Sequence, residues 1–178
     1  MIRVWLPVLT FFFFVFDGTV MQVIFPEGTG TPYVLIPRFT MIIILFIAFF
    51  MSRSTALLYG LIFGFLTDIV YSDIIGVYFF SMAFTAYLMA SISKIFRTSL
   101  LAVFLLGLLG VVLVEFQAYG MYSIVGITHV SLDEFLYVRL FPSLVLNGLF
   151  IIVMYVPMKK LFAALKAAKQ RQSDKIGG

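Results

Sequence analysis

Charged side chains inside apolar segments are the residues of this chain that could do chemistry. A charge in hydrocarbon costs on the order of 3 kcal/mol unless it faces protein or water. Grouped charges avoid much of that cost by pairing or by lining a wet cavity. Such a group either fixes how helices pack or forms a polar hub that binds a ligand or receives a partner. The charges that interrupt apolar runs are Asp17, Arg38, Asp68, Glu115 and Arg139.

Enzymatic chemistry is not indicated by the other reactive residues. An aspartate pair for intramembrane proteolysis needs carboxylates on two facing helices around a shared water, and Asp68 and Asp73 are too close in sequence to provide it. His129 has no second histidine or cysteine with which to hold a metal. No glycine-rich phosphate loop or serine hydrolase set is present. We therefore predict that the protein is not an enzyme and needs no metal or cofactor.

Two glycines and an aspartate share one face of a predicted helix. Gly60, Gly64 and Asp68 are spaced at i, i+4 and i+8, and Gly76 begins the next apolar run. Glycines at this spacing let a second helix approach closely, and a carboxylate on the same stripe needs a hydrogen-bond donor. We therefore predict that this face packs against another helix, either of its own bundle or of a partner protein.

The composition places these residues in a membrane protein. Hydrophobic residues make up 63% of the 178-residue chain and charged residues 11%, whereas a soluble domain is about half apolar and a quarter charged. A chain of this length can hold about six membrane-spanning helices and almost no soluble domain. We predict an all-α integral membrane protein, a compact bundle of six helices. The net charge of +4 lies in loops and tail, so nucleic-acid binding is not indicated.

The apolar runs divide the chain into one transmembrane domain, residues 1–158, and a basic tail. The turn at Ser72 and Asp73 is so short that the third and fourth spans must form an antiparallel hairpin. A cleaved signal peptide is the competing interpretation of the first run, which is too long and lacks a cleavage site. The predicted spans are residues 4–25, 33–51, 56–71, 74–92, 100–119 and 137–156.

Charge asymmetry between the loops predicts the orientation. Cytoplasmic loops of membrane proteins are enriched in lysine and arginine. Both termini are therefore expected in the cytoplasm, and the five charges within spans fall in the outer half of the membrane. If they serve packing, Asp17 or Asp68 pairs with Arg38 or Arg139 and so fixes how the helices pack. Arg3, Arg53, Lys94, Arg97 and the tail lie on the basic side, and Glu27, Asp73, Asp133 and Glu134 on the other.

The tail, residues 159–178, has an apolar stripe and a basic face. The stripe consists of Met158, Leu161, Phe162 and Leu165, at i, i+3, i+4 and i+7. We predict an amphipathic helix on the inner membrane surface, attracted by anionic lipid. Two alternatives stay open: a last span that overruns the bilayer, or a docking strip for a cytoplasmic partner. The basic residues are Lys159, Lys160, Lys166, Lys169 and Arg171.

One stretch resembles a known family. The stretch consists of an apolar helix ending in Gly60-xxx-Gly64-Phe65-Leu66-Thr67-Asp68, a short turn, and Gly76-Val77-Tyr78 at the start of the next helix. This pattern resembles that of the rod shape-determining protein MreD family. Gly64, Asp68 and Gly76 are the positions that match best. The resemblance extends to the whole chain, with its small loops and basic cytoplasmic end.

The resemblance implies a non-enzymatic subunit of the bacterial cell-elongation machinery in the cytoplasmic membrane. It implies binding to the bitopic protein MreC and, through it, a link to the MreB filament, the glycosyltransferase RodA and a class B penicillin-binding protein. Such a subunit helps to maintain cell shape and peptidoglycan synthesis. It also implies a fold resembling that of the S components of energy-coupling-factor transporters.

The alternative function is that of such an S component, which captures a vitamin. The two families share size and helix count, so the fold cannot separate them. S components commonly carry an Ala-xxx-Ala strip in the first span, and residues 4–25 contain no alanine. The residues therefore favour the MreD family.

Overall fold

The computed structural model describes residues 2–24, 33–96 and 99–176, and within them the side chains of 5–19, 33–96, 99–168 and 170. Helices are the only regular secondary structure in these ranges, which confirms the predicted all-α fold. Arg3, Glu27, Arg97, Lys169 and Arg171 have side chains outside the described set. The elements are α1 (Ile2–Ile24), α2 (Phe39–Phe50), α3 (Arg53–Tyr71), α4 (Val77–Ile92), α5 (Leu100–Val125), α6 (Leu132–Glu134), the π-helix η1 (Phe135–Leu140) and α7 (Phe141–Ile176).

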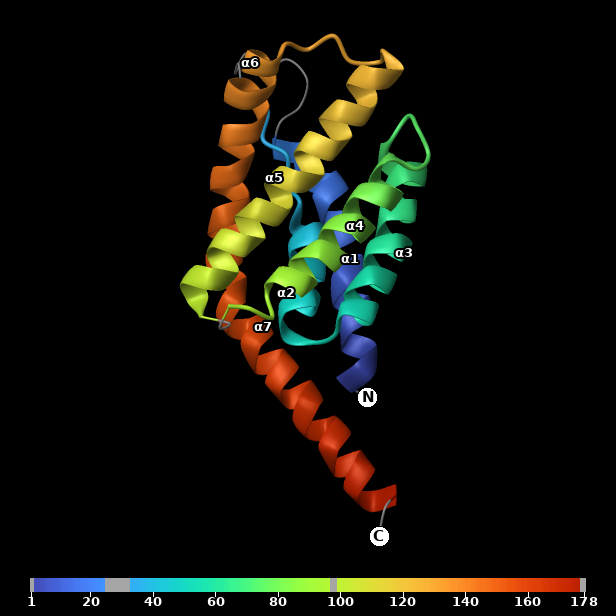
Figure 1. Cartoon of the computed structure of the whole chain (residues 1–178), viewed down its shortest axis with the longest axis vertical. Helices are drawn as coiled ribbons and strands as arrows, with labels where there is room; N and C mark the ends of the chain where they lie inside the picture. The colour runs from blue at the N-terminus through green and yellow to red at the C-terminus, as the bar shows by residue number, and fades with distance from the viewer. Residues whose placement is uncertain (1, 25–32, 97–98, 177–178) are drawn as a thin grey trace.

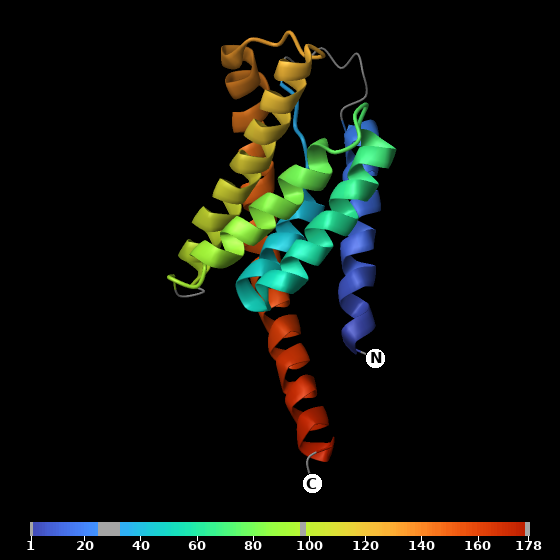
Figure 2. The same cartoon turned by 45° about the vertical axis from the view of Figure 1, so that its right-hand side comes forward.

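The bundle is built around α2. This helix contacts α1, α3, α4, α5 and α7, and every one of its residues except Phe49 is buried. The start of α1 and the end of α7 both lie toward the same end of the long axis, so the two termini are at that end (Figures 1 and 2). The connections from α2 to α3 and from α4 to α5 lie at that end too.

Apolar helices long enough to cross a membrane account for much of the fold. Three meet that description by length and composition among the residues described: Arg53–Tyr71, Leu100–Val125 and Leu132–Ala168. Three shorter apolar helices, Trp5–Thr19, Phe39–Phe50 and Val77–Ile92, complete the bundle. The fold is that of a helical membrane protein, and the count of six spans stays a prediction.

The second apolar run differs from its predicted form. We expected a span over residues 33–51, yet residues 33–38 are not helical and α2 begins at Phe39. The extended backbone is held by the last helical segments: Val34 N donates to the Val138 carbonyl at 2.8 Å, and Ile36 N donates to Ser143 Oγ at 2.9 Å. These bonds replace the helical ones, so a non-helical segment is tolerated inside the bundle.

The predicted tail continues α7. Met158 and Phe162, two of the four stripe residues, are buried, and the Phe162 ring stacks on Phe50 with centroids 5.6 Å apart. The stripe therefore packs on the bundle as a continuation of α7. The exposed side chains of Lys159, Lys160 and Lys166 lie along this stretch. Attraction of the tail to anionic lipid stays a prediction.

The glycine face of α3 packs against α4. A Cβ built on Gly60 would lie 2.8 Å from Ala83 Cα, and one built on Gly64 would lie 2.5 Å from the Tyr78 carbonyl oxygen. Both are closer than real Cβ contacts allow, and in each case the obstacle is backbone. The close approach predicted from the glycine spacing is thus made within the α3–α4 hairpin, which leaves this face no room for a partner helix.

We predict that Gly64→Ala destabilises the protein, because the new methyl group forces the α3 and α4 backbones apart. The free energy of unfolding should fall by about 1–3 kcal/mol. Gly120→Ala in α5 is the matched control, since nothing lies within 4 Å of a Cβ built there, and it should be neutral or stabilise by up to about 1 kcal/mol. Thermal unfolding of the detergent-purified proteins measures both. Equal stabilities would contradict the packing argument.

Candidate functional site

Glu115 binds two arginines inside the bundle. Its side chain, on α5, is 1% exposed. Arg38 Nε donates to Oε1 at 2.5 Å, while Arg139 Nε and Nη2 donate to Oε2 at 3.2 and 3.1 Å. Arg38 ends the extended segment before α2, and Arg139 projects from the π-helical turn η1, a distortion that often marks functional sites. We call Arg38, Glu115 and Arg139 the Glu115 triad.

Asp17 caps the N-terminus of α2. Its Oδ1 and Oδ2 accept hydrogen bonds from the backbone amides of Phe39 and Thr40, each at 3.0 Å. The first amides of a helix have no partner within the helix, and the helix dipole favours a negative charge beside them. A carboxylate in the apolar part of α1 thus allows α2 to begin within the bundle.

Asp68 does the same for α4. Its Oδ2 accepts from the amides of Gly76 and Phe79 at 2.8 and 2.9 Å, and its Oδ1 accepts from the amide of Tyr78 at 2.8 Å. Gly76 has a φ of 113°, a conformation that glycine adopts without strain. The Gly76 turn therefore brings three amides onto one carboxylate, which closes the hairpin.

The five charged residues do not form the ion pairs that we predicted between an aspartate and an arginine. Neither Asp17 nor Asp68 forms an ion pair with an arginine in the part of the chain that is described, because backbone amides occupy their oxygens. Glu115 takes both arginines instead. Asp68 connects to them through Tyr78, whose hydroxyl accepts from Arg38 Nη2 at 2.8 Å.

Sequence reasoning missed three polar residues of this site: Tyr78, Ser143 and Asn147. Asn147 Oδ1 accepts from Arg38 N and its Nδ2 donates to the Ile36 carbonyl, both at 2.9 Å. Ser143 and Asn147 are separated by one helical turn within an apolar run. That spacing was the available signal, because two polar side chains on one face of a span need polar partners.

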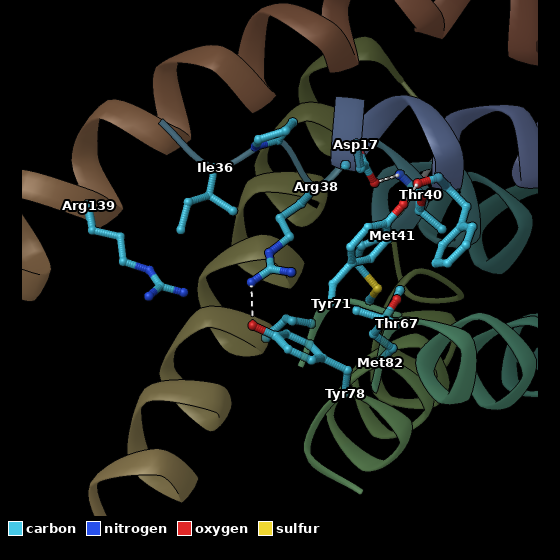
Figure 3. Close-up of a pocket in the computed structure, with 14 residues that line it drawn as sticks. Asp17, Ile36, Arg38, Thr40, Met41, Thr67, Tyr71, Tyr78, Met82 and Arg139 are labelled. Atoms are coloured by element: carbon cyan, nitrogen blue, oxygen red, sulfur yellow. Dashed lines mark hydrogen bonds between the residues drawn. The ribbon is translucent and has the colours of Figure 1, made fainter. Parts of the chain in front are cut away.

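A cavity of about 300 Å³ lies among these groups. Figure 3 shows the two guanidinium groups turned toward one another and the Asp17 carboxylate turned toward Thr40. Apolar and polar residues from the helices and from the extended segment share its wall. The lining includes Phe14, Asp17, Ile36, Arg38, Thr40, Met41, Thr67, Tyr71, Tyr78, Met82, Val114 and Arg139.

The fold and this site define a helical membrane protein whose interior holds a charged network and a small cavity lined by both polar and apolar residues. The family described as rod shape-determining protein MreD matches residues 2–165. The chain is also 34% identical over 133 residues to the rod shape-determining protein MreD of Bacillus subtilis strain 168, covering 75% of this chain and 77% of that protein. The chain belongs to the MreD family.

Family membership confirms the resemblance drawn from the Gly60–Tyr78 stretch and favours it over the transporter alternative. The protein is thus a rod shape-determining membrane protein. No solved structure matches the chain, so the likeness to the S-component architecture stays a prediction.

We predict that Asp17→Asn lowers the free energy of unfolding by about 1–2 kcal/mol, because the amide presents a donor to α2 where an acceptor is needed. Asp73→Asn is the matched control: Asp73 is exposed in the turn before α4, and its substitution should change stability by less than about 0.5 kcal/mol. Thermal unfolding in detergent compares them. A control as damaging as Asp17→Asn would show that the cap is not the cause.

Two double-mutant cycles test the charge network. Glu115→Gln and Arg139→Gln should couple by on the order of 1–3 kcal/mol, because the two side chains share two hydrogen bonds. Asp68→Asn and Arg139→Gln should couple more weakly, by less than about 1 kcal/mol, because Asp68 reaches Arg139 only through Tyr78, Arg38 and Glu115. Unfolding free energies of the single and double variants give both coupling terms. Stronger coupling in the second cycle would refute this assignment.

Proposed function

We propose that this chain is a non-enzymatic subunit of the bacterial rod complex, which binds an MreC-like bitopic protein and helps to maintain cell shape and peptidoglycan synthesis. The observation that carries the proposal is membership of the MreD family over residues 2–165. Through the MreC-like protein the subunit is linked to the MreB filament, RodA and a class B penicillin-binding protein.

A non-enzymatic role agrees with how the charges are used. The oxygens of Asp17 and Asp68 accept from backbone amides, and those of Glu115 accept from arginines. Such a carboxylate serves the fold, whereas a general acid or base must face a reacting group. No cluster of metal-binding side chains occurs in the described ranges, and the proposal requires none.

The proposed location is the bacterial cytoplasmic membrane, with several spans and both termini in the cytoplasm. Support comes from the arrangement of basic loops. The ends of the chain and the α2–α3 and α4–α5 connections share one end of the bundle (Figures 1 and 2). Arg53 begins α3 and Lys94 follows α4, so basic residues gather at that end, as the positive-inside rule requires.

We further propose that the single span of the MreC-like partner packs into a groove between α1 and α3. The groove holds about 600 Å³ and is lined by Pro7, Val8, Phe11, Leu58, Tyr59, Ile62, Phe63 and Leu66. The glycine face of α3 is filled by α4, so a partner helix needs another surface. Helices associate in membranes chiefly through such packing contacts.

A pull-down from native membranes tests both parts of this proposal. A tagged full-length chain in mild detergent should recover an MreC-like protein together with an elongation glycosyltransferase or transpeptidase. Ile62→Trp fills the groove and should reduce recovery of the MreC-like protein about tenfold, a loss of about 1.4 kcal/mol. Val145→Trp is the matched control, because Val145 is 75% exposed on α7 and lies outside the groove.

The outcomes separate the two parts. Equal recovery by Ile62→Trp and Val145→Trp would mean that the partner span does not pack into the groove, while the subunit role would stand. Recovery of paired ATPases with a transmembrane coupling subunit, in place of the elongation proteins, would overturn the subunit role.

A further inference from the structure

Both arginines of the Glu115 triad retain hydrogen-bond donors. A guanidinium has five N–H donors. Arg38 uses Nε and Nη2, and Arg139 uses Nε and Nη2. Within the described residues, no hydrogen bond is made by Nη1 of either arginine. No nitrogen of either arginine is among the buried polar atoms that lack a hydrogen-bond partner, and both side chains line the cavity described above. Their remaining donors are therefore accessible to an acceptor that enters this cavity.

The triad also carries an excess positive charge. Two guanidinium groups share the single carboxylate of Glu115. Asp17 lines the same cavity, but its oxygens accept from the amides of α2 and its carboxylate turns away from the arginines (Figure 3). In an apolar bundle a charge without a partner is expensive. One further negative charge beside the guanidinium groups would balance the triad.

The cavity beside the two arginines is large enough to hold such an anion. Its volume of about 300 Å³ is at the lower end of the range of ligand pockets, which is about 300–1,000 Å³. The Arg139 side chain is 38% exposed and that of Arg38 14%, so Arg139 stands nearer the entrance. Met82 and Val114 supply apolar wall. The Tyr78 hydroxyl accepts from Arg38 and keeps its own proton to donate.

We propose that this cavity binds a phosphodiester monoanion, with its phosphate oxygens on Arg38, Arg139 and Tyr78 and its apolar portion against Met82 and Val114. A phosphodiester carries one negative charge at neutral pH, which equals the excess of the triad. Planar guanidinium groups match phosphate oxygens in geometry. The source is either the headgroup of an anionic phospholipid or a small soluble phosphodiester. The proposal goes beyond the subunit role and does not depend on it.

The test is ligand-dependent thermal unfolding of the delipidated full-length protein in detergent. Three probes are titrated: soluble glycerophosphoglycerol, dihexanoyl phosphatidylglycerol and dihexanoyl phosphatidylcholine. A ligand that binds only the folded state raises the unfolding temperature, and the shift grows with the logarithm of the ligand concentration above the dissociation constant, which gives the affinity. We expect this from phosphatidylglycerol, with at least about tenfold weaker binding of phosphatidylcholine, whose ammonium group opposes the triad. A concentration-dependent shift with the soluble probe as well would identify the free phosphodiester as sufficient, and its absence would identify a lipid.

Three variants locate the effect. Arg139→Gln should weaken phosphatidylglycerol binding at least about tenfold, and Met82→Phe, which fills the cavity, should abolish the shift. Arg53→Gln is the matched control, because Arg53 lies over the Tyr87 ring and outside the cavity lining, and it should bind as the parent does. No concentration-dependent shift with any probe would overturn the proposal. Unchanged binding by either cavity variant, or equal binding of phosphatidylcholine, would overturn it too.

Discussion

Backbone amides that begin helices inside an apolar bundle set the main constraint on this structure. In the hydrocarbon region no water is available to satisfy them. Asp17 and Asp68 do so for α2 and α4. The Asp17 carboxylate thus stabilises the start of α2 at Phe39, directly after the extended segment that enters the core. Charges that look costly for single spans are therefore part of what makes the bundle possible.

A network of hydrogen bonds and ion pairs joins the capped helices. Asp68 accepts from the Tyr78 amide, the Tyr78 hydroxyl accepts from Arg38, and Arg38 and Arg139 both donate to Glu115. This series of bonds runs through α3, α4, the segment before α2, α5 and η1. Removing one member leaves another charge buried without a partner, which costs more than the pair itself contributes. The network therefore ties helix packing to the shape of the cavity it surrounds.

Sequence reasoning identified the elements but not the partners of these charges. Composition predicted a helical membrane protein, the short turn predicted the α3–α4 hairpin, and the spacing of Gly60 and Gly64 predicted a close helix contact. Hydropathy could not show that residues 33–38 are extended, because an apolar strand and an apolar helix have the same composition. The position of a residue along a predicted span indicates its depth in the membrane, but not which residue lies opposite it in the bundle. The sequence therefore could not show that Glu115 binds both arginines.

Helix α1 connects the two surfaces to which we assign functions. Phe14 lines the charged cavity and Phe11, about one turn away, lines the groove between α1 and α3. Tyr71 of α3 donates to the Phe14 carbonyl at 3.1 Å, so α1 and α3 are hydrogen-bonded to each other at the cavity wall. A ligand in the cavity that shifts α1 must therefore change the affinity of the groove for a helix, and the groove's occupant must change ligand affinity by the same factor. The proposed anion site and the proposed partner groove are thus linked through α1.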